Sequence, residues 1–292
     1  MDCQPVWRHL CTLAMTRLDR GTPKRLVESA WKNCRDFCAL EAGSTHLWTR
    51  WLLLRAVGFV YILIFAGIIV ESRVMMWPDG VLPIRAGLDE MLRQSAHPLE
   101  AFLRAPGLFW LHSGPAMIVL LEWLGLGAAI ALMCNLRPRL ALLICWVTFL
   151  SFVVTQGFFA ATQPDQLMLE VALLCLPLAP AGNRPGLGAL AAPRRIAVFA
   201  IRWMLIRLMF EAGLAKFVYG AAMWRDLTAM DVMYETAPIP PIIGYWFHQL
   251  PHGFHAGEVL ITFLAEIPAP LLAVFGGRWG RWFAFWSWCV LQ

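Results

Sequence analysis

Long apolar runs constrain this chain more than any other feature. A membrane-spanning helix needs about 17–25 consecutive, mainly apolar residues. Seven segments reach or approach that length: 51–70, 115–134, 140–160, 166–180, 196–213, 256–275 and a last one that begins at Trp282 and stops at Gln292. The sequence therefore predicts an all-α integral membrane protein, a polytopic helical bundle with six full spans and a truncated seventh.

The composition supports a bilayer environment. Apolar residues make up 59% of the 292 positions, charged residues make up 15%, and the mean hydropathy is +0.61. A soluble domain carries about 25% charged residues. These values exclude a soluble enzyme, a disordered protein and a nucleic-acid-binding module. We expect the lipid bilayer as a partner and no nucleic acid.

The distribution of basic residues predicts the orientation of the bundle, because Lys and Arg are enriched in cytoplasmic loops. Fourteen of the 24 Lys and Arg fall in segments 1–47, 135–139, 181–195 and 276–281, and six fall in the intervening segments 71–114, 161–165 and 214–255. We therefore expect a cytoplasmic N-terminal segment (1–47) and a transmembrane bundle (48–292) with two long outward-facing loops, 71–114 and 214–255. Residues 25–40 predict either an amphipathic helix on the inner surface or a loosely ordered tail.

Charged residues inside the spans indicate a polar site. A charge in the hydrocarbon core costs about 2.5–3.5 kcal/mol on insertion scales, so it faces the bundle interior and often marks function. The predicted orientation puts six polar groups in the outer half of the bundle: Glu122, Gln156, Glu170, Glu211, Lys216 and Glu258. Arg202, Arg207 and Glu266 are nearer mid-depth. We expect a polar cavity that opens outward beneath loop 214–255. The alternative is structural pairing, as between Arg207 and Glu211 at i and i+4.

Lys216 is the most informative of these groups. Gly213, three residues earlier, permits a second helix to approach closely. A lysine in a partly dry cavity can act as a base, or its ammonium group can extend to the interface. Because several acids lie at the same depth, we expect Lys216 to stay charged. Paired with Glu170 or Glu211, it would hold the fourth and fifth spans together.

Loop 214–255 is too aromatic and too rich in proline to be a passive linker. We expect its aromatic and charged residues to be fixed against the bundle: Trp224, Arg225, Asp226, Asp231, Tyr234 and Glu235. Either Arg225 or Arg202 should pair with a nearby acid.

Three histidines in this loop, His248, His252 and His255, have spacings that would suit a metal ion on one helix face. We expect Pro251 and Gly253 to break a helix there, and no fourth ligand is obvious. The sequence therefore predicts no metal site and no cofactor, and it indicates hydrogen-bonding histidines instead.

Residues 202–270 carry a long motif, R-x-x-x-x-R-x-x-x-x-x-G-L-x-K, followed by W-R-D-L-T and Y-E-T-x-P-x-P. Shorter motifs occur at Gly80-Val81-Leu82-Pro83 and at Asp165-Gln166-Leu167-Met168-Leu169-Glu170. Over about 48–292 the chain resembles the lipase maturation factor family. That family continues into more membrane helix and a C-terminal globular domain, so we expect the C-terminal part of the family to be missing here.

The resemblance implies a chaperone-like, multi-pass protein of the endoplasmic reticulum membrane, or of the inner membrane in bacteria. It would assist the folding and assembly of exported lipases through its outward loops. A shorter stretch, Ala212-Gly213-Leu214-Ala215-Lys216 followed by Trp224, is similar to vitamin K-dependent γ-glutamyl carboxylase, in which the matching lysine is an active-site base. The alternative is thus a carboxylase-like membrane enzyme with a lipophilic cofactor. We expect the maturation factor, with no catalytic residue, rather than the enzyme.

Overall fold

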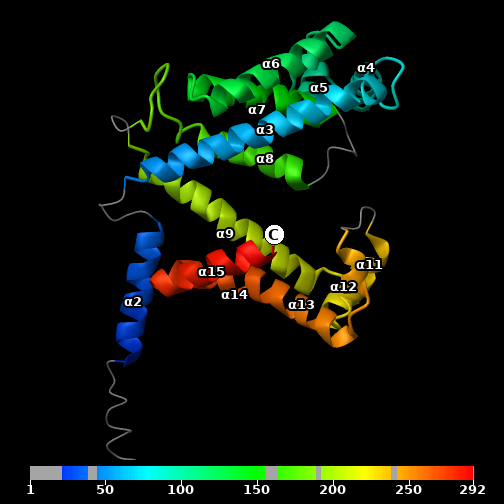
Figure 1. Cartoon of the computed structure of the whole chain (residues 1–292). Helices are drawn as coiled ribbons and strands as arrows, with labels where there is room; N and C mark the ends of the chain where they lie inside the picture. Colours follow the sequence, from blue (N-terminus) through cyan, green and yellow to red (C-terminus); the bar gives the residue numbers. More distant parts are fainter. Residues whose placement is uncertain (1–21, 39–44, 156–162, 189–191, 238–241, 292) are drawn as a thin grey trace, which may run out of the picture. The chain divides into compact units, whose positions relative to one another are not determined.

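The computed structural model of the chain describes residues 22–38, 45–155, 163–188, 192–237 and 242–291. Within these ranges the chain is helical and contains no β-strand, which confirms the predicted fold class (Figure 1). The chain divides into two compact units. We call Gly43–Ile201 the central unit, and Met1–Ala42 together with Arg202–Gln292 the terminal unit.

The central unit is built on helix α3, which packs against α6 and α7, while α8 packs against α7. Its core contains stacked rings of Tyr61 and Phe65 from α3, and Phe149 of α7 lies edge-on to both. Gly125 of α6 faces Phe65 so closely that a Cβ atom there would clash with the ring. The helices are α3 (Leu47–Met75), α4 (Ile84–Gln94), α5 (Pro98–Arg104), η1 (Leu108–Trp110), α6 (Pro115–Met133), α7 (Pro138–Thr155) and α8 (Gln163–Cys175).

The terminal unit joins one helix from the start of the chain to the last third of it. Phe37 of α2 packs with Ile206 of α9, Ala269 and Ala273 of α14, and Ala284 of α15. Of the two alternatives for residues 25–40, the helix is confirmed up to Phe37 as α2, and its place on the inner surface stays a prediction. The helices are α2 (Thr22–Phe37), α9 (Arg195–Val218, whose first turns belong to the central unit), α10 (Ala222–Arg225), α11 (Ala229–Thr236), α12 (Gly244–His248), α13 (His252–Glu266), α14 (Pro268–Phe275) and α15 (Gly277–Leu291).

Helices α13 and α14 form one bent span. Pro268 is the first residue of α14, and proline has no N–H to donate to the carbonyl of Leu264 one turn earlier. The neighbouring carbonyl of Ala265 accepts a hydrogen bond from the Trp288 indole at 2.8 Å, so α15 supplies a donor where the helix is interrupted.

Four helical segments among the described residues are long and apolar enough to cross a membrane: Leu47–Met75, Pro115–Met133, Pro138–Thr155 and His252–Phe275. The predicted number of spans is not confirmed. Helix α8 has 13 residues, which at about 1.5 Å per residue is shorter than a hydrocarbon core of about 30 Å. Helix α9 has 24 residues, but Arg202, Arg207, Glu211 and Lys216 interrupt its apolar surface.

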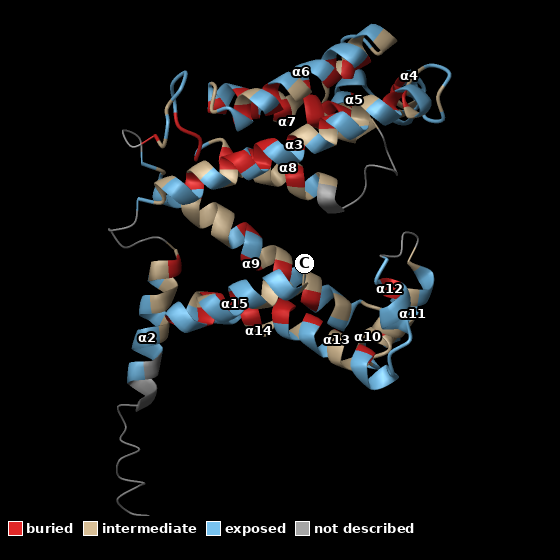
Figure 2. Ribbon diagram, viewed as in Figure 1, coloured by how far each residue is buried: buried red, intermediate tan, exposed pale blue. Residues whose placement is uncertain are grey.

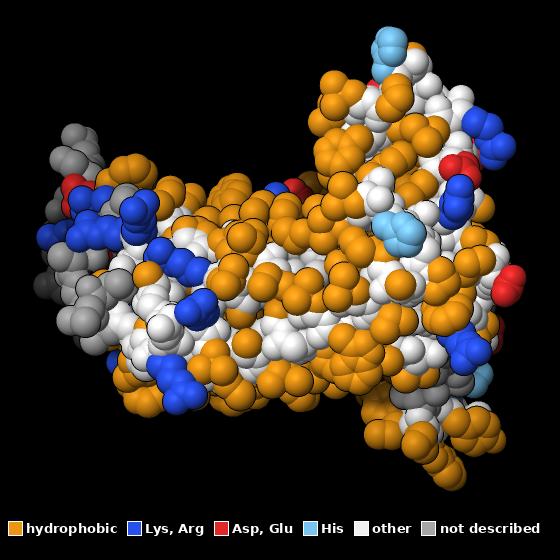
Figure 3. All heavy atoms as spheres, turned by 90° about the horizontal axis from the view of Figure 1, so that it is seen from above, with side chains coloured by type: hydrophobic (Ala, Val, Ile, Leu, Met, Phe, Trp, Pro, Cys, Tyr) orange, Lys and Arg blue, Asp and Glu red, His pale blue; other side chains and the backbone are white. Residues whose placement is uncertain are grey.

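The burial pattern is that of helices surrounded by lipid. In the 18-residue apolar window of each span, only 33–44% of the residues are buried inside the protein, and exposed stripes run along α3 and α6 (Figure 2). Leu63 of α3 and Trp123 of α6 are both more than half exposed. A space-filling view shows hydrophobic side chains over a broad area of the surface (Figure 3). This surface suits a bilayer and not water.

Candidate functional site

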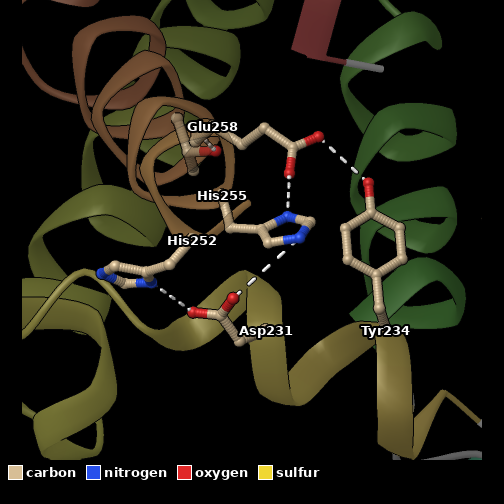
Figure 4. Close-up of polar contacts among 6 residues, drawn as sticks. Asp231, Tyr234, His252, His255 and Glu258 are labelled. Carbon is tan, nitrogen blue, oxygen red and sulfur yellow. Dashed lines mark hydrogen bonds and ion pairs between the residues drawn. The ribbon is translucent and has the colours of Figure 1, made fainter. Parts of the chain in front are cut away.

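A group of five polar side chains joins α11 to the first two turns of α13 (Figure 4). We call it the α11–α13 cluster, and its members are Asp231, Tyr234, His252, His255 and Glu258. The Tyr234 hydroxyl donates to Glu258 Oε1 at 3.0 Å, and His255 Nδ1 lies 3.1 Å from Glu258 Oε2. His252 Nδ1 lies 2.8 Å from Asp231 Oδ2. The cluster therefore fixes part of the predicted outward loop against a membrane-spanning helix.

The local sequence explains this geometry. Asp231 and Tyr234 are three residues apart on α11, so they share one face of that helix. His252, His255 and Glu258 follow the same spacing on α13, which begins directly after Pro251. The two faces meet, and the ring of Tyr234 lies 5.3 Å from that of His255, centroid to centroid. His255 is 2% exposed and is the centre of the cluster.

The environment of Tyr234 fixes the proton on its hydroxyl group. Partial burial and the hydrogen bond to Glu258 raise the pKa of Tyr234 to about 12, so its hydroxyl remains a donor at neutral pH. The hydrogen bond between His255 Nδ1 and Glu258 Oε2 places one proton between these two atoms. The other ring nitrogen lies 3.9 Å from Asp231 Oδ1, beyond hydrogen-bond distance.

A second polar contact lies where α9 meets the end of α13. Lys216 Nζ is 2.5 Å from Glu266 Oε1, and the two side chains are 26% and 7% exposed. The ammonium group also lies 5.4 Å from the centre of the Trp224 ring. Gly213 makes this approach possible, because a Cβ atom there would come within 2.7 Å of the Glu266 Cβ and of an Ile267 side-chain carbon.

The predicted partner of Lys216 was wrong. We expected Glu170 or Glu211, but the lysine pairs with Glu266. Glu211 is instead 66% exposed on its side chain and lies 3.7 Å from Arg207, as the i, i+4 spacing predicts. Helix α9 approaches α13 at Gly213, and this brings Glu266 to the lysine.

The predicted ion pair of Arg202 or Arg225 was also wrong. Arg202 donates to the main-chain carbonyls of Phe37 at 2.6 Å and Asp36 at 3.3 Å, where α2 ends and carbonyls lack helical partners. Among the described residues, Arg225 and Asp226 form no side-chain hydrogen bond or ion pair, and both are exposed. The acid that does pair in this loop is Asp231.

Other candidate residues lie apart from these two contacts. Glu235 and His248 are exposed, and His248 ends α12 and does not share a helix with the other histidines. We expected Gly253 to break the helix, but it lies inside α13.

The remaining candidate residues belong to the central unit. Glu122 is buried beside Ser72, and Glu170 lies on α8. Gln156 lies outside the described residues. The predicted cavity combines residues of both units and stays a prediction.

The sequence indicated hydrogen bonds for His252, but it named no partner for His252 or for Asp231. The signal that connects them is the repeated three-residue spacing on two neighbouring helices. Within the described part of the chain, no group of three or more His, Cys, Asp or Glu side chains is arranged to hold a metal ion. The α11–α13 cluster contains two sets of hydrogen bonds, one between Asp231 and His252 and one that joins Tyr234 and His255 to Glu258.

Comparisons with known proteins cover most of the chain. Residues 48–292 match the family model of the lipase maturation factor transmembrane domain. Lipase maturation factor 1 of Bos taurus is 31% identical over 245 residues, which cover 82% of this chain and 43% of that protein. Lipase maturation factor 2 of Gallus gallus is 33% identical over 254 residues, 83% of this chain and 35% of that protein. The chain thus spans less than half the length of these curated relatives. No solved structure matches the chain.

Proposed function

The chain belongs to the lipase maturation factor family, and from this membership we propose that it is a membrane-embedded factor that assists the folding and assembly of exported lipases. The match over residues 48–292 is the observation that carries the proposal. It would act in the endoplasmic reticulum membrane of a eukaryotic cell or the inner membrane of a bacterium. The N-terminus would be cytoplasmic, because 14 Lys and Arg lie in the segments on that side.

We assign client binding to the outward loop 214–255. The α11–α13 cluster holds α11 at the end of a span. Exposed apolar side chains lie beside it on α12 and at the residue just before α12: Ile243, Tyr245 and Trp246. A folding factor must contact apolar segments that its client has not yet buried. Fixed, exposed aromatic side chains suit that contact because they provide large area with little conformational freedom.

Depletion of the chain from its native cell tests the function. We expect the activity of exported lipase per mole of lipase protein to fall, because the lipase would be exported or retained without its native fold. Normal specific activity of every exported lipase after depletion would contradict the proposal. Re-expression of the chain is the control for indirect effects.

A matched pair of substitutions tests the surface. Trp246→Ser should reduce the rescue of lipase activity, while Trp48→Ser should not, because Trp48 is equally exposed (70% for each) but lies at the start of α3. Both variants should reach wild-type levels in the membrane. Equal rescue by the two variants would contradict client binding at α12.

The carboxylase-like alternative is not favoured. It requires Lys216 as a free base, whereas the lysine is engaged by Glu266. Lys216→Arg separates the two functions, since arginine keeps the charge but does not act as a base at neutral pH. We expect Lys216→Arg to retain activity and Lys216→Met to lose it. Loss of activity in a normally inserted Lys216→Arg protein would favour the enzyme.

A further inference from the structure

Helix α2 runs across the ends of α14 and α15 and not alongside them (Figure 1). The Asn33 side-chain amide donates to the carbonyl of Phe275 at 2.9 Å, and Phe275 is the last residue of the span His252–Phe275. Arg202 holds the other side of the contact by donating to the Phe37 carbonyl. Since the span is directed across the bilayer, a helix that crosses its end lies at the membrane boundary, along the surface.

The side chains of α2 form three stripes. At about 100° per residue, Asn33 and Phe37 lie on one face, and both contact the rest of the terminal unit. Val27 and Trp31 form a second, apolar stripe, and they are 68% and 63% exposed. The third stripe is exposed and basic, with Arg25, Lys32 and Arg35. The apolar stripe separates the inward face from the basic one.

This arrangement points to one occupant for the exposed faces of α2. Exposed apolar residues next to basic residues are typical of helices that lie in a membrane interface, where Lys and Arg contact anionic headgroups. Among the described residues of α2, three positively charged side chains and one negatively charged side chain, that of Glu28, are exposed. We propose that α2 is an in-plane helix that binds anionic lipid headgroups through Arg25, Lys32 and Arg35, with Val27 and Trp31 inserted at the acyl boundary.

The proposal is independent of the proposed function. Helix α2 lies outside residues 48–292, the part of the chain that matches the family. The contact with Phe275 places it at a membrane boundary whichever way the bundle is oriented. Helix α2 would make the position of the terminal unit in the membrane depend on the lipid composition of one leaflet.

The full chain, reconstituted into vesicles, provides the test. An environment-sensitive fluorescent amino acid replaces Trp31 and reports the polarity around it. We expect a blue shift of its emission in phosphatidylcholine vesicles that contain phosphatidylglycerol, compared with phosphatidylcholine alone. The shift should be reversed by high salt, because salt screens the attraction between headgroups and basic residues.

Charge variants make the test specific. Arg25→Gln/Lys32→Gln/Arg35→Gln should abolish the shift, and the charge-conserving Arg25→Lys/Arg35→Lys should keep it. Neutralising three exposed arginines elsewhere, Arg85→Gln/Arg93→Gln/Arg104→Gln, is the matched control and should keep it as well. The thermal midpoint of each protein in detergent verifies that it has folded.

Three results would overturn the proposal. The first is the same emission in both kinds of vesicle, and the second is a shift that persists in the neutralised α2 variant. The third is an emission in lipid-free detergent that is already blue-shifted when the protein self-associates, because a second copy of the chain would then cover the apolar stripe. None of these results affects the lipase proposal, which is tested by lipase activity.

Discussion

Helices α13 and α14 belong to one bent span, yet they are held in different ways. Four ionisable residues of α13, His252, His255, Glu258 and Glu266, bond to other ionisable side chains. Helix α14 packs through Ala269 and Ala273 against apolar neighbours, and its last carbonyl accepts a hydrogen bond from the neutral amide of Asn33.

The difference between the contacts of α13 and α14 indicates where single substitutions should destabilise the terminal unit most. Removal of one partner from a buried charged pair leaves the other charge without compensation, which costs more than the pair itself contributes. Removal of a neutral donor from an exposed carbonyl costs less, because water replaces it. We therefore expect substitutions along α13 to have larger effects than those at the end of α14.

The largest effect should come from Lys216→Met, which leaves the Glu266 carboxylate buried without a positive partner. We expect a loss of ~3 kcal/mol, the lower end of the range for buried pairs, since Lys216 is partly exposed. Unfolding of the purified protein by denaturant in detergent would measure it. The double variant Lys216→Met/Glu266→Gln should recover part of the loss, because it removes the unpaired charge. Additive effects of the two substitutions would show that they do not interact in the folded protein.

Tyr234→Phe should have the next largest effect, since it removes the hydroxyl that donates to Glu258. A hydrogen bond to a charged group contributes about 1.5–3 kcal/mol, and the lower value applies at this partly exposed site. The thermal midpoint should fall, and amide exchange in α11 should increase. Tyr245→Phe on α12 is the matched control, because its exposed hydroxyl forms no hydrogen bond to another described residue. Equal midpoints for the two variants would contradict the role of the α11–α13 cluster.

Tyr234 should also make the stability of the α11–α13 cluster depend on pH, whereas α14 has no titratable side chain. The pKa of Tyr234 is raised from 10.0 to about 12 in the folded protein, so the folded state retains a proton that the unfolded state loses. The resulting stabilisation is complete below about pH 10 and is lost as the pH rises through about 12. Thermal unfolding between pH 9 and pH 12 should therefore show a decline that Tyr234→Phe does not share. A decline of the same size in both proteins would assign it to other groups.

The smallest effect should be that of Asn33→Ala, which removes the donor to the Phe275 carbonyl. A loss of about 1 kcal/mol is expected for a neutral hydrogen bond. It should be confined to α2, with faster amide exchange in 22–38 and unchanged exchange in α11 and α13. Ser29→Ala, at an exposed position of the same helix, serves as the control. Faster exchange in α11 as well would show that the two ends of the span are coupled.

The sequence predicted the helical class, because apolar runs and the scarcity of charge depend only on local composition. It also selected Lys216, Tyr234, His255 and Glu258 as candidates. It did not predict that Lys216 pairs with Glu266, because the spacing of residues along one helix contains no information about which other helix lies beside it. Nor did it predict the bend at Pro268 within the apolar run 256–275, since hydropathy averages over a single proline.

The Lys216–Glu266 pair also sets an order for the synthesis of the protein. The two residues are 50 positions apart, and ribosomes add about 5–20 residues per second. Lys216 therefore leaves the ribosome several seconds before the only acid that it contacts among the described side chains. During that interval the ammonium group of Lys216 lacks the partner that it has in the folded protein, so the close contact at Gly213 forms only after α13 is made.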